Sequence, residues 1–329
     1  MDECRRLVLP GSLGAESTSR RRPEARRTDR FTRGCVSCAA GCRVALALIV
    51  ALAVPSAAAE PFAQGLLWRL DKPGIPPSWV FGTLHSNDPR VRTPPAPVAQ
   101  AFSRARTFAM EIYWSETEDE HFYEAMQFDD DRHLAALVGD EVYSRLRQEL
   151  GAAALPEEVL ARTKPWAALL RIAAARGMGD GPTLDRSLFI AARERRMTML
   201  GLEWLDEQVA AFEAIPIETQ IALLRHALDH RAELEAQIEP TILAWLDRNL
   251  AALARINRVA AGDDADLRRH YALLTQQLVA NRTALMAYRL FLPLKRGRVF
   301  VAVGALHLYG ANGLLAQLHE QGYRVRRIY

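Results

Sequence analysis

Two segments near opposite ends of the chain decide how it folds: Trp79-Val80-Phe81-Gly82-Thr83-Leu84-His85 and Val299-Phe300-Val301-Ala302-Val303-Gly304-Ala305-Leu306-His307. Each is a short apolar run, which predicts a buried strand, followed by Gly-x-x-His. The Gly at the strand end permits a backbone conformation or a close approach that other residues do not. Ligands of open α/β sheets bind outside the carboxyl ends of the strands. Two His residues at the carboxyl ends of two strands indicate one shared site. Either His alone could also be a structural histidine.

The rest of the chain predicts where the other strands lie. Residues 65–70 alternate like a hairpin strand that pairs with Trp79–Phe81, and Thr107–Ile112 follows a helical stretch, which makes a β-α-β unit that favours a parallel pair. A short strand is predicted at Thr198–Glu203 and an edge-like one at 323–328. Helical spacing fills most of the remainder, with Pro216 and Pro240 as breaks.

These elements predict an α/β fold: a mixed, mainly parallel central sheet flanked by helices. We expect residues 60–329 to form a single domain with a large helical insertion at about 116–290.

The first 59 residues have the features of an export signal. A basic stretch precedes eleven consecutive apolar residues, 44–54, and Ala57-Ala58-Ala59 follows. A charged n-region, an apolar core of this length and a small-residue cleavage site are typical of a secretory signal peptide, and the apolar run is short for a permanent bilayer span. We place cleavage after Ala59, within two residues, and expect a periplasmic or secreted protein with no permanent membrane span. A buried helix or an uncleaved anchor is the alternative.

The n-region is unusually long, so translation can also begin downstream of Met1. In that case residues 1–35 would not belong to the natural protein. All four Cys, including the Cys35-x-x-Cys38 pair, precede Ala59, so the mature chain would contain no thiol and no disulfide.

Charge is unevenly distributed along the sequence. The net charge is +3, but residues 1–43 carry ten Arg against five acidic residues, which leaves about −2 for the rest. The folded part therefore offers no electrostatic case for binding nucleic acid.

Four predicted strand ends carry reactive side chains: His85, Glu111, Glu203 and His307. Two His and one carboxylate form a common catalytic metal set, and a bound metal ion activates water and polarises a carbonyl group. A metal-free site uses the same residues, with one His as general base and a carboxylate that orients it. The spacing alone leaves both possibilities open.

Each of the other candidates has a plainer explanation as well. Glu111 interrupts an apolar strand, which a structural ion pair would also explain, and Glu203 could cap the helix that follows it. Arg282 lies in an amphipathic helix and could clamp a carboxylate or stabilise an oxyanion, but a solvated Arg fits the same position. Asp185 is explained by the dipole of the helix that it begins. The remaining His are predicted to be surface residues: His121, His133, His226, His230, His270 and His319.

Taken in order, these motifs resemble the TraB/GumN family, which includes the animal TIKI proteins. The resemblance covers about Gly65 to Tyr329. It rests on the motifs Gly65–Leu70, Phe81–His85, Met110-Glu111, Thr183-Leu184-Asp185, Leu200–Glu203, Asn281-Arg282, Val303–Gly310 and Gly322–Val325.

The resemblance implies an α/β fold like that of the erythromycin esterases and ChaN-like proteins, with helical additions. TIKI proteins are manganese- or cobalt-dependent proteases. The family's paired Gly-x-x-His, its Glu and its Arg map onto His85, His307, Glu111 and Arg282. Tyr309 replaces the Pro that usually follows the second motif, which touches no catalytic position.

The leading hypothesis is an exported, metal-dependent peptidase. His85, Glu111 and His307 would hold a divalent metal ion (manganese, cobalt or zinc) or activate water, Arg282 would stabilise developing negative charge, and Glu203 would support them. One alternative is a metal-free esterase or amidase that acts on a small ester or amide with His as general base. The other is a protein that binds haem or a peptide without turnover, with a His and Tyr309 as the haem ligands.

Overall fold

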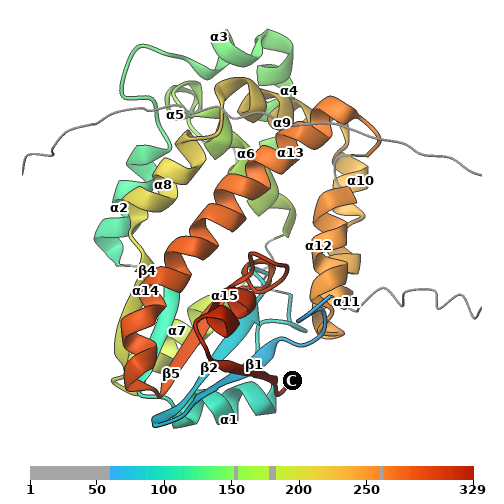
Figure 1. The fold of residues 1–329 in the computed structure, drawn as a ribbon. Coiled ribbons are helices and arrows are strands. Elements are labelled where there is room, and N and C mark those ends of the chain that lie inside the picture. Colours follow the sequence, from blue (N-terminus) through green and yellow to red (C-terminus); the bar gives the residue numbers. More distant parts are fainter. Residues whose placement is uncertain (1–59, 87, 114, 152–154, 178–182, 260–261) are drawn as a thin grey trace, which may run out of the picture. The chain divides into compact units, whose positions relative to one another are not determined.

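A six-stranded mixed sheet forms the centre of the fold (Figure 1). The computed structural model describes residues 60–329 except 87, 114, 152–154, 178–182 and 260–261, and these residues belong to one compact unit. The expected signal peptide and the four Cys lie outside the described residues. The strand order is β4-β3-β5-β2-β1-β6. The strands are β1 (Leu67–Lys72), β2 (Ile75–Thr83), β3 (Thr107–Ile112), β4 (Thr198–Glu203), β5 (Val299–Gly304) and β6 (Arg324–Arg327).

Strands β4, β3, β5 and β2 run parallel, while β1 pairs antiparallel with both β2 and β6. The predicted α/β class and the predicted hairpin of β1 and β2 are therefore confirmed. The β-α-β prediction needs one refinement. Strands β2 and β3 do run in the same direction, but β5, from the far end of the chain, lies between them. The two Gly-x-x-His segments thus follow neighbouring strands.

Strand β5 occupies the middle of the sheet because its side chains are apolar on both faces. Residues Val299–Val303 are all buried, as expected for a central parallel strand covered on both sides. Helix α1 (Ala96–Arg104) packs against one face through Phe102, whose ring centroid lies 5.2 Å from that of Phe300. Helix α14 (Arg282–Arg296) contacts β2, β4 and β5. The sheet is thereby fixed in the core, with the carboxyl ends of four parallel strands at one edge.

The helical insertion consists of two stretches separated by β4. Between β3 and β4 lie α2 (Glu116–Ala125), α3 (Leu134–Val138), α4 (Asp140–Leu150), α5 (Glu157–Ala161), α6 (Pro165–Gly177) and α7 (Leu184–Glu194). Between β4 and α14 lie α8 (Leu205–Glu213), α9 (Ile217–Asp229), α10 (Arg231–Glu235), α11 (Ile238–Leu246), α12 (Leu250–Val259), α13 (Ala265–Thr275) and the π-helix η2 (Gln276–Asn281). Strand β5 is followed by the short 3₁₀ helix η3 (Ala305–His307) and by helix α15 (Leu314–Glu320).

The two proline breaks behave differently. Pro216 immediately precedes α9 and ends the preceding helical stretch, as predicted. Pro240 lies in the first turn of α11, where the missing N–H would have no intrahelical partner, and the predicted break falls just before it, between the end of α10 at Glu235 and the start of α11 at Ile238.

Part of the helical insertion has small cores of its own. Leu146, Leu160 and Leu224 belong to one buried cluster, and Trp166 stacks on Phe212 with ring centroids 4.8 Å apart in another. These clusters are distinct from the core around the sheet, so the insertion forms a helical layer over the strand ends (Figure 1). Within the described residues, no helix has the length and apolarity needed to cross a membrane.

Candidate functional site

The two Gly-x-x-His segments meet because their strands pair. Thr83, the last residue of β2, is in register with Gly304, the last residue of β5. His85 follows two residues after β2, and His307 ends the 3₁₀ turn η3 directly after β5. Both imidazoles line the same cleft at the carboxyl edge of the sheet. The structure thus brings together the two His that the sequence singled out.

Each motif contains a Gly at a position where a side chain would clash with, or crowd, a neighbouring residue. Neither Gly82 nor Gly304 has a positive φ, so backbone conformation is not the reason. A Cβ on Gly82 would lie 2.8 Å from Leu308 Cδ1 and 3.1 Å from Ala305 Cα, which would push η3 away from the sheet. A Cβ on Gly304 would lie 3.3 Å from Glu111 Oε1. The glycines therefore allow the second His segment and a carboxylate to lie against the strand ends.

Glu111 is the centre of the site. Its Oε1 accepts a hydrogen bond from the backbone N–H of Gly304 at 2.7 Å, and its Oε2 accepts one from Arg282 Nη2 at 2.8 Å. The same Oε1 lies 3.8 Å from His85 Nε2 and 3.9 Å from His307 Nε2. One carboxylate oxygen thus faces both imidazoles, while the rest of the group is anchored to the protein.

Arg282 and Glu203 form a buried, bidentate ion pair behind Glu111. Arg282 Nε and Nη2 donate to the carboxylate oxygens of Glu203 at 2.7–3.0 Å, and Nη1 donates to the carbonyl oxygen of Leu278. The Glu203 side chain is fully buried and that of Arg282 is 10% exposed. Glu203 therefore points toward Arg282 and not toward the end of α8, whose N-terminal N–H at Trp204 is bonded by Glu207. Arg282 is buried, not solvated.

A π-helix lies immediately before Arg282. Helices α13, η2 and α14 follow one another without a break, and η2 supplies the carbonyls of Leu278 and Val279. The carbonyl of Val279 accepts a hydrogen bond from the Thr283 hydroxyl at 2.7 Å. Segments of π-helix occur frequently at functional sites, because they change the direction in which the following side chains point.

The hydrogen bonds around His307 fix its tautomer. The single proton of the Thr283 hydroxyl is donated to Val279, so the hydroxyl oxygen must accept from His307 Nδ1–H, 2.8 Å away. In the neutral imidazole this leaves a lone pair on Nε2, the atom that faces Glu111 Oε1. Two Lewis-basic atoms therefore face each other across a gap of 3.9 Å.

His85 is held by a matching partner. Its Nδ1 lies 3.1 Å from Asp185 Oδ2, and Thr83 Oγ1 donates to Asp185 Oδ1 at 2.6 Å. Thr183 is the N-cap of α7, so Asp185 is not needed to cap that helix. Sequence reasoning missed Asp185, which it assigned to the helix dipole, and it did not consider Thr283. The signal for Asp185 was the Thr183-Leu184-Asp185 motif that contributes to the family resemblance, and the signal for Thr283 was its place next to Arg282.

Burial and neighbouring charges act on the pKa values of the three central groups in different directions. Burial by itself raises the pKa of Glu111, but the neighbouring imidazole of His85 and the positive charges of His307 and Arg282 outweigh it, so the pKa lies well below its usual value. Burial lowers the pKa of His307, against the attraction of Glu111. The carboxylate of Asp185 raises the pKa of His85 well above its usual value, an effect that solvent screens because 63% of the side chain is exposed. Glu111 is therefore ionised at neutral pH.

A comparison with family models matches residues 66–327 to the TraB/PrgY/gumN family. The chain belongs to this family. No curated protein and no solved structure matches the chain. The TraB/PrgY/gumN match confirms the resemblance inferred from the motifs, and it spans all five predicted site residues: His85, Glu111, Glu203, Arg282 and His307.

The imidazole and carboxylate groups of the site are chemically suitable ligands for a metal ion, but they are not arranged as a complete coordination shell. Among the described residues, no group of three or more His, Cys, Asp or Glu side chains is arranged to hold a metal ion. Two ligands about 2.1 Å from one ion lie at most about 4.2 Å apart. The separations of 3.8 and 3.9 Å between Glu111 Oε1 and the two Nε2 atoms are within that limit. The lone pair on Nε2 of neutral His307 and the partner on each Nδ1 also match the way metal-bound His is oriented.

The reactive groups line a cleft of about 500 Å³. Its apolar lining residues include Leu234, Leu253, Ile256, Leu278 and Leu306, and its polar ones include Thr241 and Asn257. Tyr309, the second ligand of the haem alternative, lines a different hollow from His307. The arrangement suits an uncharged substrate group held beside Glu111.

Replacing Arg282 by Met should destabilise the protein by about 3–5 kcal/mol, because it leaves the buried Glu203 carboxylate without its partner. Urea denaturation measures this change. The matched control is Arg289→Met on the same helix, where Arg289 pairs with the partly exposed Glu207, and it should cost about 1 kcal/mol or less. Equal losses in the two variants would contradict a special role for the buried pair.

Proposed function

We propose that this protein is a peptide-bond hydrolase whose reactive centre is formed by Glu111, His85 and His307. One observation carries the proposal. Glu111 Oε1 faces the Nε2 atoms of both imidazoles at 3.8 and 3.9 Å, while the far side of each imidazole is held by its own partner, Asp185 or Thr283. Such preorganised basic atoms at the side of a cleft are suited to take a proton from a water molecule that attacks a carbonyl group.

The roles of the surrounding residues follow from their contacts. Glu111 is ionised and takes part in binding and deprotonating water through Oε1. Arg282 gives most of its N–H groups to Glu203, Glu111 and Leu278, so we assign it chiefly to holding Glu111 in place and only secondarily to stabilising negative charge on the substrate. Glu203 keeps the guanidinium in that orientation.

A divalent metal ion (manganese, cobalt or zinc) would be held by His85, Glu111 and His307. When bound, such an ion lowers the pKa of a coordinated water to about 7 and polarises the substrate carbonyl. Asp185 and Thr283 would then orient the ligands His85 and His307, since a partner on the other ring nitrogen keeps a ligating His in one tautomer.

A metal-free esterase or amidase is the second candidate, and one observation favours it. His85 is paired with Asp185, is 63% exposed and lines the cleft, which is the arrangement of a general base oriented by a carboxylate. Both candidates use the same residues, so they are separated by the effect of chelation.

The purified protein should cleave members of a peptide library, and His85→Ala and His307→Ala should each lower kcat/KM at least about 100-fold. His121→Ala is the matched control, because that imidazole is exposed and is not among the residues that line the cleft. Loss of activity with a strong chelator and recovery with manganese, cobalt or zinc would identify the metal-dependent form, and activity that survives chelation the metal-free form. Absence of peptide cleavage under all these conditions would remove the proposal.

Thr283→Val should lower activity about 10- to 100-fold, because His307 Nδ1–H loses its acceptor, and Thr283→Ser should restore most of it. Thr219→Val provides a matched control: Thr219 is equally buried and its hydroxyl lies 2.8 Å from Nδ1 of His270, outside the cleft. Steady-state kinetics and unfolding midpoints should be measured together. If both Val variants lose stability alike and neither loses kcat, Thr283 has only a structural role.

We also propose that the protein is exported and acts in the periplasm or outside the cell. The support is the basic stretch, the apolar run 44–54 and the Ala57-Ala58-Ala59 site in the sequence. Expression of the full chain in a Gram-negative host should give a processed protein that begins within two residues of Glu60, as read by mass spectrometry of its N-terminal peptide. An unprocessed chain that stays in the cytoplasm would contradict the proposal that the protein is exported.

A further inference from the structure

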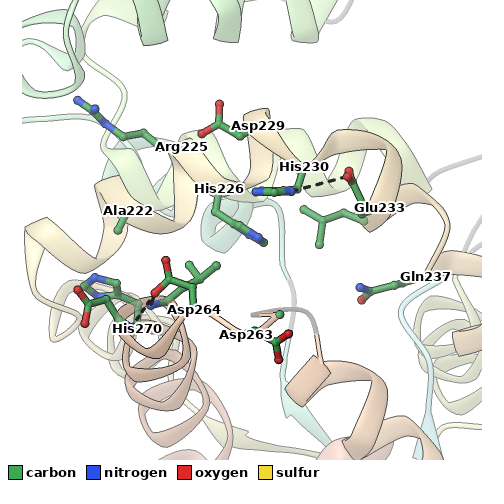
Figure 2. Close-up of a pocket in the computed structure, with 14 residues that line it drawn as sticks. Ala222, Arg225, His226, Asp229, His230, Glu233, Gln237, Asp263, Asp264 and His270 are labelled. Atoms are coloured by element: carbon green, nitrogen blue, oxygen red, sulfur yellow. Dashed lines mark hydrogen bonds and ion pairs between the residues drawn. The ribbon is translucent and has the colours of Figure 1, made fainter.

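The cleft that holds the reactive groups adjoins two further large hollows, besides a small one of about 90 Å³ that shares His85 and Glu111 with it. A second hollow of about 530 Å³ is formed by α9, α10 and α13, and it contains none of the five predicted site residues (Figure 2). A third, of about 320 Å³, is lined by residues of α12, η2 and the segment 309–313. The volumes of the two outer hollows are far larger than packing defects, so each has room for several atoms of a ligand.

The second hollow adjoins the cleft along two separate contacts. Leu234 and Gln237 line both of them. In addition, Tyr271 lines the cleft while its hydroxyl lies 3.2 Å from Nδ1 of His226, which lines the second hollow. These side chains are half-buried and lie where the two spaces adjoin. His226 and His270 are partly buried here, which differs from the surface positions predicted for them, because they pair with Tyr271 and Thr219.

The third hollow adjoins the cleft on other residues. It shares Asn257, Val279 and Leu306 with the cleft and shares no lining residue with the second hollow. The cleft with Glu111, His85 and His307 is therefore the middle member of a row of three. A ligand bound along this row passes the reactive groups and extends beyond them in two directions.

The chemical character changes along the row. Apart from the reactive groups, the side chains that line the cleft are aliphatic or uncharged, and Arg282 is already neutralised by two carboxylates. A charged substrate side chain would therefore be desolvated there without a partner of opposite charge. The second hollow is polar: Figure 2 shows His226, His230 and His270 together with carboxylates such as Asp263 and Glu233 around it. An apolar group is thus favoured beside the reactive atoms and a solvated polar segment farther along.

We propose that the three hollows form one groove that binds an extended peptide chain, with an apolar side chain beside the scissile bond and chain continuing on both sides of it. The inference rests on the proposed hydrolase function and narrows its substrate class from small esters, amides and peptides to the interior of longer chains. Leu234, at the junction of the first two hollows, is the residue that controls passage from one to the other.

The test compares a decapeptide whose two ends are blocked with a tripeptide amide that contains the same central Leu. The wild-type protein should cleave the blocked decapeptide internally, next to the Leu, with kcat/KM at least about tenfold higher than for the tripeptide, because remote binding energy raises the rate. Replacing the Leu by Asp should reduce cleavage by about tenfold or more, since a buried unpaired charge is costly.

Leu234→Trp should lower the ratio of decapeptide to tripeptide kcat/KM at least about fivefold, because the indole fills the junction. Ala232→Trp adds the same ring on the same short helix at an exposed position that lines none of the three hollows, and its ratio should equal that of the wild type. Equal kcat/KM values for the two peptides, or an unchanged ratio in Leu234→Trp, would overturn the inference.

Binding separates a failure of this inference from a failure of the hydrolase proposal. Fluorescence anisotropy of labelled peptides reports affinity whether or not the peptides are cleaved. If the longer peptide binds more tightly but neither peptide is cleaved, the groove inference is supported and the hydrolase proposal is wrong. If the peptides are cleaved but the affinity does not depend on peptide length, the groove inference is wrong and the hydrolase proposal is retained.

Discussion

The buried contact of Arg282 with Glu203 and Glu111 is the interaction on which the rest of the site depends. It joins the ends of β3 and β4 to the first turn of α14, three elements that lie far apart in the sequence. Two carboxylates this close would repel each other in a low-dielectric environment, and the guanidinium between them removes that repulsion. Because Oε2 of Glu111 is occupied in this way, its Oε1 is left to face the two imidazoles. The position of the Glu111 carboxylate is thus set by a group that does not itself need to react.

The fold could be predicted from the sequence wherever one segment carried its own signal. The apolar runs at Trp79–Phe81 and Val299–Val303 are strands, the 198–203 strand has the predicted bounds, and the two Gly-x-x-His segments lie together as expected. Parallel strands deliver their ends to one edge, so His85, Glu111, Glu203 and His307 had to be neighbours once the class was known. Strand order was harder, because the insertion of β5 between β2 and β3 depends on long-range packing that no local pattern encodes.

The parts of the site that could not be predicted are those that act through another residue. Asp185 and Thr283 are ordinary helix residues in sequence, and their roles arise only when β2 and β5 bring a His next to each. The π-helix before Arg282 has no periodic signature, because a single widened turn leaves the apolar spacing of a long helix almost intact. His226 and His270 were expected at the surface since their neighbours in sequence are polar, but the contacts that cover them come from other helices.

Because β5 lies inside the sheet, the site at the strand ends can form only after the chain has been synthesised through β5. The strand that carries His307 is the fifth of six in sequence order yet lies between β2 and β3 in space, so the earlier strands cannot form their final sheet until nearly the whole polypeptide has been made. Folding must close contacts across more than two hundred residues, a topology associated with slow folding. Until that closure a nascent or truncated chain holds only one of the two imidazoles. Premature release from the ribosome before residue 299, or proteolytic loss of the segment from residue 299 onward, would therefore yield a fragment that lacks both β5 and His307.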